Sequence, residues 1–175
     1  MDFELTTAIP VLERTPATLE ALLVGLPADW TEVNEGSDSW TVHEIVAHLI
    51  HAEHDDWVPR ARHLLQWGAS RAFAPFDRTF GFEAARARPL AELVREFARC
   101  RAESLDALAS LRLTSADLAR EGRHPEFGVV TLGLHLATWV AHDLTHVSQI
   151  VRVMGVQYRD AVGPWSRYLR IMRGA

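Results

Sequence analysis

The stretch TLGLHLATWVAHDLTHVSQIVRVM, from Thr131 to Met154, carries the clearest structural pattern in the chain. It contains no proline, starts with a residue type that caps helices and is followed by Gly155. At 1.5 Å per residue it predicts a helix of about 36 Å. An apolar stripe follows one side of this helix, made by Leu132, Leu136, Trp139, Val147, Ile150 and Met154.

Working outward from this segment, the apolar residues elsewhere also recur at helical spacing, and alternating runs typical of strands are almost absent. The residues Thr41-Val-His-Glu44 form a capping-box pattern that predicts the start of another helix. We expect three more helices, over about 3–24, from Thr41 to near Trp67-Gly68, and from Pro89 to about Leu111. The pattern therefore indicates an all-α fold.

Prolines modify two of these helices. Pro10 and Pro16 predict an irregular or kinked first half of the first helix, and Pro59 should bend the second or split off its last turns.

The segments between and after the helices are shorter or less regular. Residues 69–88 carry few periodic apolar positions and predict a long connection of the kind that often lines a cleft. We expect a short helical piece at 115–120, a loop containing Gly122 and Gly128, and a last apolar piece at 165–172 across one end of the bundle.

Composition limits the classes of function. The chain has 175 residues, enough for one core, and we expect a single domain over 1–175. Its net charge of -5 disfavours nucleic acid as a partner. A single cysteine, Cys100, excludes an intrachain disulfide. The acidic start, MDFELTTAIP, and the lack of a long apolar run predict a cytoplasmic protein that does not enter membranes.

Eight of the nine histidines fall in the second and fourth predicted helices. His142 and His146 are four residues apart, so both rings lie on one helix face, at the edge of the apolar stripe. On the second helix His48 borders the core, whereas His51 should point away from it. His43 and His54 fall on the other flank.

His48, His142 and His146 are therefore placed to converge on one divalent transition metal. Three neutral nitrogens would leave coordination positions open for water or substrate. The plainer interpretation is that each ring packs at the edge of the core and makes an ordinary hydrogen bond.

Two segments resemble the DinB-like superfamily of four-helix bundles, which includes metal hydrolases of the YfiT type and bacterial thiol-dependent transferases. They are WTVHEIVAHL at 40–49, and HDLTHVSQI followed by VRVMG at 142–155. The resemblance implies an up-down four-helix bundle with a short C-terminal helix, and a homodimer. It also implies that His48, His142 and His146 bind the metal, with zinc or nickel as the first expectation and manganese or iron as alternatives.

Two functions follow as hypotheses. The first is a metal-dependent hydrolase or thiol-dependent transferase, acting on a small molecule such as a low-molecular-weight thiol. The second is a non-catalytic bundle in which the ion only joins two helices, serving as a stress-response or interaction module. A fourth protein ligand would favour the second function, and an open position the first.

Other polar residues have open roles. Glu53 and Asp143 lie within apolar stripes, where each would orient a ligand histidine, act as a base or pair with an arginine. His135 lies near the metal pair. We expect Cys100 to be an inert core residue, although its arginine neighbours favour a lower thiol pKa. The arginines that can bind an anionic substrate, or simply be solvated, are Arg60, Arg62, Arg71 and Arg78.

Overall fold

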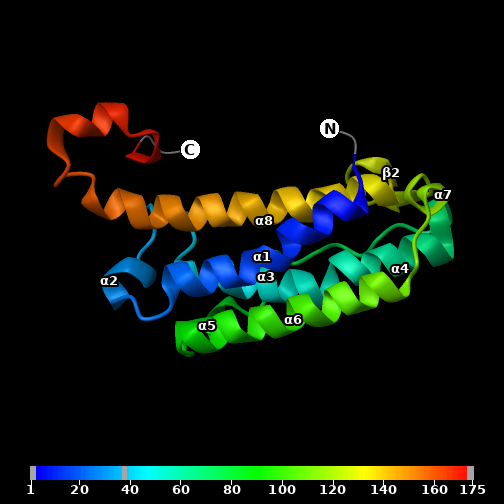
Figure 1. Ribbon diagram of the computed structural model, residues 1–175, viewed down its shortest axis with the longest axis horizontal. Coiled ribbons are helices and arrows are strands. Elements are labelled where there is room, and N and C mark those ends of the chain that lie inside the picture. Colours follow the sequence, from blue (N-terminus) through cyan, green and yellow to red (C-terminus); the bar gives the residue numbers. More distant parts are fainter. Residues whose placement is uncertain (1–2, 37–38, 173–175) are drawn as a thin grey trace.

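The computed structural model describes residues 3–36 and 39–172, and within them four long helical segments form a bundle (Figure 1). These segments are α1 (Leu5–Leu23), α3 (Val42–Asp55) continued by α4 (Trp57–Trp67), α6 (Leu90–Ser110) and α8 (Leu132–Gly155). The all-α fold and the four-helix bundle expected from the sequence are confirmed. Thr131 caps α8, and its hydroxyl accepts a hydrogen bond from the amide of Leu134.

Shorter elements connect and extend the bundle. They are α2 (Ala28–Thr31), η1 (Gly68–Ser70), α5 (Phe82–Arg86), α7 (Ser115–Leu118), β1 (Glu121–His124), β2 (Gly128–Thr131), η2 (Val156–Tyr158), η3 (Gly163–Tyr168) and η4 (Arg170–Met172). The antiparallel β1–β2 hairpin replaces the loop predicted around Gly122 and Gly128. The last piece consists of 3₁₀ turns rather than one helix, and it turns back over the end of α8 instead of crossing the bundle (Figure 1).

Pro59 explains the break between α3 and α4. It has no backbone N–H, and in a straight helix its ring would meet the carbonyl of Asp55, four residues earlier. The helical angles are distorted at Asp56, where φ is -106° and ψ is -75°, and α3 and α4 are separated at this residue. The split predicted from the sequence is therefore confirmed.

The first helix stays continuous although it contains two prolines. Pro16 cannot donate to the carbonyl of Leu12, which would otherwise be left unpaired inside the bundle. The guanidinium of Arg101, on α6, donates to this carbonyl at 2.9 Å. A buried side chain from another helix thus replaces the hydrogen bond that the proline removes.

The helices do not simply alternate in direction. One core cluster joins the end of α1 with the starts of α3 and α6 and the end of α8, while a second joins the opposite ends. Hence α3–α4 runs parallel to α6, and α1 runs parallel to α8 (Figure 1). The chain makes this arrangement by crossing back along the bundle between Gly68 and Pro89.

The apolar stripes of the helices face the interior of the bundle. Trp139 of α8, Phe97 of α6 and Ile45 of α3 are each fully buried. Among the described helices, none has both the length and the apolar character needed to cross a membrane.

Candidate metal centre

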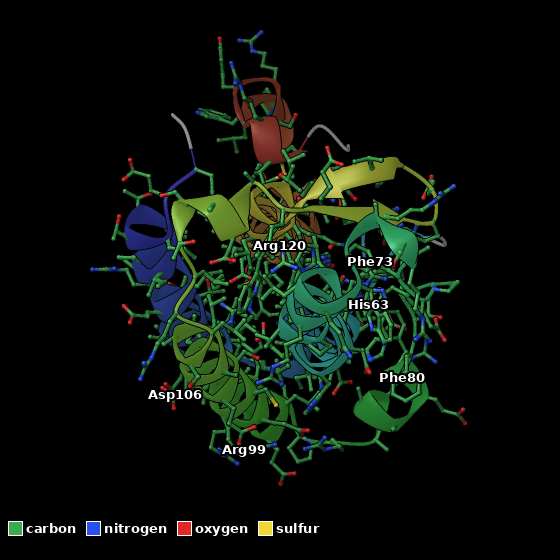
Figure 2. All side chains as sticks on the ribbon, turned by 90° about the vertical axis from the view of Figure 1, so that its right-hand side faces the viewer. His63, Phe73, Phe80, Arg99, Asp106 and Arg120 are labelled. Atoms are coloured by element: carbon green, nitrogen blue, oxygen red, sulfur yellow. The ribbon has the colours of Figure 1, made fainter. Side chains whose placement is uncertain are left out.

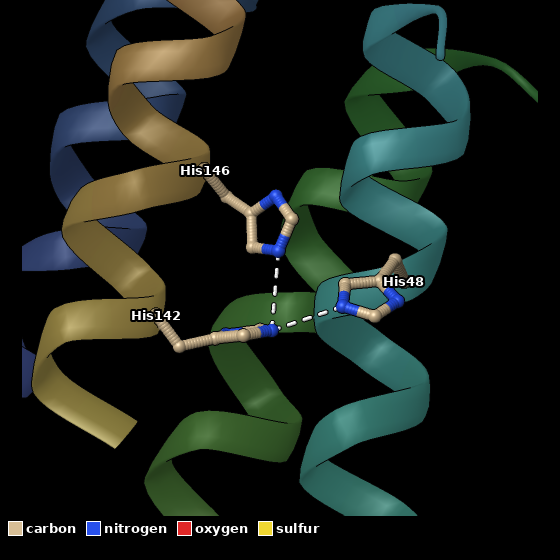
Figure 3. A group of neighbouring side chains, drawn as sticks. All are labelled: His48, His142 and His146. Carbon is tan, nitrogen blue, oxygen red and sulfur yellow. Dashed lines mark hydrogen bonds between the residues drawn. The ribbon is translucent and has the colours of Figure 1, made fainter. Parts of the chain in front are cut away.

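Three imidazoles converge between α3 and α8, as the sequence predicts (Figure 3). The Nε2 atom of His142 lies 2.9 Å from Nε2 of His48 and 3.1 Å from Nε2 of His146. His48 and His146 are buried, and His142 is partly buried. Three side chains from positions 48, 142 and 146 therefore present the same type of nitrogen to one point.

Local structure places each ring. His142 and His146 are one turn apart on α8, so both face α3. The capping box of Thr41 and Glu44 sets the start of α3, with the Thr41 amide donating to the Glu44 carboxylate at 2.7 Å. This start places His48 in the second turn of α3, opposite the α8 pair.

The outer nitrogens of two rings have acceptors that determine their tautomers. His48 Nδ1 donates to the carbonyl oxygen of Arg78 at 3.0 Å, and His146 Nδ1 donates to the Gln149 side-chain oxygen at 2.8 Å. In a neutral ring whose Nδ1 carries the proton, Nε2 holds a lone pair. The central point is therefore faced by at least two lone pairs.

His142 lacks such an acceptor. Its Nδ1 is buried and has no hydrogen-bond partner among the described residues. One proton on Nε2 of His142 can serve only one of its two neighbours. Without a cation the three nitrogens cannot all be satisfied, so the arrangement fits a bound metal ion better than a hydrogen-bonded cluster.

All three rings are neutral at pH 7. Burial, with the nearby His146, lowers the pKa of His48 from its ordinary 6.5 to about 4. Burial, together with His146 and His48, lowers the pKa of His142 to about 2. Burial also lowers the pKa of His146, against the opposing effect of Gln149. Neutral imidazole is the form that binds metals.

The spacing suits a metal within small adjustments. Nitrogens bound at 2.0–2.1 Å to a tetrahedral ion are separated by about 3.3 Å. The 2.9 and 3.1 Å separations need an expansion of only a few tenths of an ångström. Among the described residues, no fourth histidine, cysteine or carboxylate joins the three histidines in a cluster with this spacing.

The three histidines open onto a cavity of about 600 Å³. The long connection predicted to line a cleft supplies Phe73, Phe76 and Arg78 to its wall. Figure 2 shows Phe73 close to His63, on the side of α4 that this connection covers. The β1–β2 hairpin contributes a further aromatic wall, Phe127. The walls are thus mainly apolar with a few polar groups, as in small-molecule sites.

Two of the four arginines considered from the sequence line this cavity. Arg60 is paired with Asp56 at 3.0 Å and lies over the ring of Phe73. The Arg78 guanidinium lies 5.8 Å from the ring centre of Trp40, which in turn stacks on His146. Arg62 and Arg71 are exposed and do not line the cavity.

Glu53 and Asp143 do not orient the metal pair. Arg101 donates to Glu53 at 2.7 and 3.0 Å and to Asp143 at 2.6 and 2.9 Å, and all three side chains are buried. The interhelical ion pair weighed at the sequence level is therefore the arrangement found. No sequence pattern singled out Arg101 as the shared partner.

The remaining histidines have separate environments. His135 lines the cavity and contacts the Trp57 carbonyl at 2.9 Å, outside the three-histidine cluster. His43 is buried near Thr31. His51 is not left to solvent, because Phe76 of the long connection stacks on it at 4.5 Å.

Comparisons with known proteins agree with this architecture. The family model described as the DinB superfamily matches residues 11–150. The comparison with curated proteins finds no match. A solved structure that the chain resembles is YfiT from Bacillus subtilis, described as a probable metal-dependent hydrolase with an unusual four-helix bundle topology.

The likeness to YfiT has a TM-score of 0.65 at 21% identity, over 86% of this chain and 87% of that chain. At this identity it establishes a shared fold. The family model, in contrast, spans most of the 175 residues. The chain belongs to the DinB superfamily.

Proposed function

We propose that this protein is a metal-dependent enzyme in which His48, His142 and His146 hold one divalent transition metal beside a small-molecule cavity. The observation that carries the proposal is the convergence of three neutral imidazoles on the wall of that cavity, with no fourth ligand from the described residues. Three-ligand sites that keep a position open are typical of catalytic metals.

The protein's own groups have definite tasks in this proposal. The Arg78 carbonyl and the Gln149 side chain hold His48 and His146 with Nε2 toward the ion. A divalent metal supplies Lewis-acid chemistry that makes water or a thiol acidic enough to be a nucleophile at neutral pH. The apolar walls exclude bulk water and strengthen this effect.

The reaction is hydrolysis or transfer to a thiol. The positive charge of Arg78 near the histidines favours an anionic small molecule, and the phenylalanine walls favour an apolar portion in the same substrate. A low-molecular-weight thiol with an acidic group meets the first requirement. The likeness to a probable metal-dependent hydrolase supports the hydrolytic alternative.

A second function, a bundle whose metal only joins α3 to α8, has one observation in its favour. The buried carboxylates Glu53 and Asp143 are both paired with Arg101 and so are not available as general bases. A non-catalytic role predicts a filled coordination sphere and no turnover.

Elemental analysis of purified protein, repeated for His142→Ala, tests the site itself. We expect the variant to lose one equivalent of metal relative to the wild type. His63→Ala is the matched control, because His63 lies on α4, contacts the Arg71 carbonyl and is outside the cluster. Equal metal content in all three proteins would refute the site.

Activity separates the two functions. The metal-loaded protein should be assayed with ester and amide substrates, and with a thiol plus an electrophile, beside His142→Ala. Turnover that requires metal and disappears in the variant supports catalysis. A stoichiometric metal without turnover, with a fourth ligand found by X-ray absorption spectroscopy, would support the joining role instead.

Finer features belong to the same proposal. We infer that zinc or nickel is the native ion, since imidazole ligands suit both and favour manganese less. We also infer a cytoplasmic homodimer. Native mass spectrometry would test the dimer and the identity of the bound ion together. A monomer at micromolar concentration would contradict the dimer.

A further inference from the structure

A second cluster of metal-ligand residues lies on the other side of α3. His54 of α3 and Glu96 and Cys100 of α6 offer ligand atoms that all lie within 4.8 Å of one another. The closest pair is the Cys100 sulfur and Nε2 of His54, at 3.4 Å. No contact of the three-histidine centre involves these residues.

The helices explain the position of this cluster. At about 100° per residue, His54 points roughly 120° around α3 from His48, and so toward α6 rather than α8. Glu96 and Cys100 are four residues apart and share the face of α6 that meets α3. Parallel packing of α3 on α6 then brings a histidine from one helix to a Cys–Glu pair on the other.

The residue types and spacing suit zinc. A sulfur at about 2.3 Å and a nitrogen at about 2.0–2.1 Å from a tetrahedral zinc ion are separated by about 3.5 Å. The 3.4 Å between Cys100 and His54 matches this value. Glu96, which is partly exposed, can complete a Cys–His–Glu set and leave one position for water.

An ion can reach the cluster from solvent. Cys100 is only 2% exposed, but His54 and Glu96 line a surface cavity of about 290 Å³. The carboxylate of Asp55 lines the same cavity and makes it more favourable to cations. Two of the three residues of the cluster, His54 and Glu96, are therefore reached from this cavity.

Two arginines near the cluster oppose cation binding. Arg88 pairs with Glu96 at 2.6 Å, and a guanidinium nitrogen of Arg99 lies 3.7 Å from the Cys100 sulfur. Arg88 is substantially exposed, so releasing its pair costs little. Figure 2 shows Arg99 at the outer side of the bundle, where it pairs with Glu103 and can turn fully into solvent.

The neighbours of Cys100 do not by themselves activate its thiol. Burial raises the pKa of Cys100, and the neighbouring Arg99 only partly offsets this effect. The flanking arginines therefore do not make Cys100 a reactive thiolate by themselves. Binding of zinc displaces the thiol proton and would convert the contact between sulfur and His54 into two metal bonds.

We propose that His54, Glu96 and Cys100 form a second zinc-binding site, which joins α3 to α6 and is separate from the three-histidine centre. Nothing in this site depends on catalysis at the first centre. The alternative for the same contact is a simple hydrogen bond between the thiol and the imidazole.

Cobalt distinguishes the two centres because only the second contains sulfur. Reduced protein should be titrated with Co²⁺, which substitutes for zinc, in the wild type and in a His142→Ala background that removes a ligand of the first centre. We expect a thiolate-to-cobalt charge-transfer band in both proteins, displaced by added Zn²⁺. Failure of the first centre would leave this band unchanged, so the two proposals are tested separately.

Substitutions at His54 and Glu96, which are not buried, test the site without disturbing the core. His54→Gln and Glu96→Gln should each weaken Zn²⁺ binding at this site by more than about 10-fold. Mutating even a residue that only hydrogen-bonds to a metal ligand typically lowers metal affinity about 10- to 100-fold. Cys100→Ser should remove the charge-transfer band. Glu103→Gln, on the same helix and exposed, is the matched control and should bind like the wild type.

A thiolate band that is weakened by both substitutions and unaffected by Glu103→Gln supports the site. No band in fully reduced wild-type protein, or a band insensitive to His54→Gln and Glu96→Gln, would overturn it and leave the hydrogen bond as the explanation.

Discussion

Replacing Arg101 by methionine should be among the most destabilising single changes in the bundle. All five N–H donors of this buried guanidinium are used, four on Glu53 and Asp143 and one on the Leu12 carbonyl. Methionine keeps the unbranched apolar stem but lacks the end of the guanidinium. The change therefore removes the cation and its hydrogen bonds while most of the stem's packing is kept.

The expected loss in the free energy of unfolding is about 3–5 kcal/mol, the usual effect of removing one partner from a buried ion pair. Two carboxylates that are 0–1% exposed would lose their positive partner, and the Leu12 carbonyl would lose its donor. For a chain of this size the loss corresponds to a fall in Tm of about 6–20 °C. Total stabilities are about 5–15 kcal/mol, so the variant stays folded for the measurement when the wild type lies above the lower end of this range.

Urea unfolding followed by circular dichroism measures the difference directly. Burial raises the pKa of Glu53 even beside Arg101, and removing the guanidinium raises it further. The folded variant then binds a proton more readily than the unfolded chain, so its deficit relative to the wild type should shrink as the pH falls from 7 toward 4.5. A deficit below about 1 kcal/mol, or one that grows on acidification, would refute the reasoning.

Three further predictions concern the site and its supports. When the metal is removed by a chelator, the free energy of unfolding should decrease as the pH is lowered from 6.5. Burial holds the pKa of His48 near 4 and that of His142 near 2, so the unfolded chain binds protons that the folded chain does not. The loss is up to about 1.4 kcal/mol per pH unit for each ring. Urea unfolding at pH 7 and pH 5 measures this, and a flat profile would contradict it. Gly122→Ala should lower the free energy of unfolding by about 1–3 kcal/mol, because the added Cβ would lie 2.7 Å from Cγ of the fully buried Leu64. If thermal unfolding were unchanged from the wild type, Leu64 would have moved aside and the prediction would be wrong. Thr131→Ala should lower the free energy of unfolding by about 1 kcal/mol, because it removes the N-terminal cap of α8. Thr131→Ser should retain most of the stabilisation by the cap in the same assay.

Much of the fold follows from local sequence signals. Helical periodicity, the Thr41 capping box and the position of Pro59 predicted the four long segments and the break in the second. These signals act within a few residues and need no partner elsewhere in the chain. The β1–β2 hairpin and the helix α5 were missed, because short elements depend on what packs over them rather than on a repeating pattern.

In the candidate site, too, some features have a sequence signal and others have none. The i, i+4 spacing of His142 and His146 indicated a shared face. The position of His48 at the border of the core face of its own helix indicated the third ring, as the resemblance to a known family also implied. The Arg78 carbonyl that orients His48 had no signature, since any residue at that point of the connection offers a carbonyl. Arg101 was equally hidden among the chain's arginines.

By itself, the sequence determined the helices, their apolar faces and the fact that two of the histidines would share one of those faces. Only the tertiary structure decided that α3 and α6 run parallel, that the crossing connection closes over the histidines, and that His54 meets Cys100. Helix formation is governed by neighbours along the chain, whereas distances between side chains from different helices depend on how whole apolar faces are buried against one another.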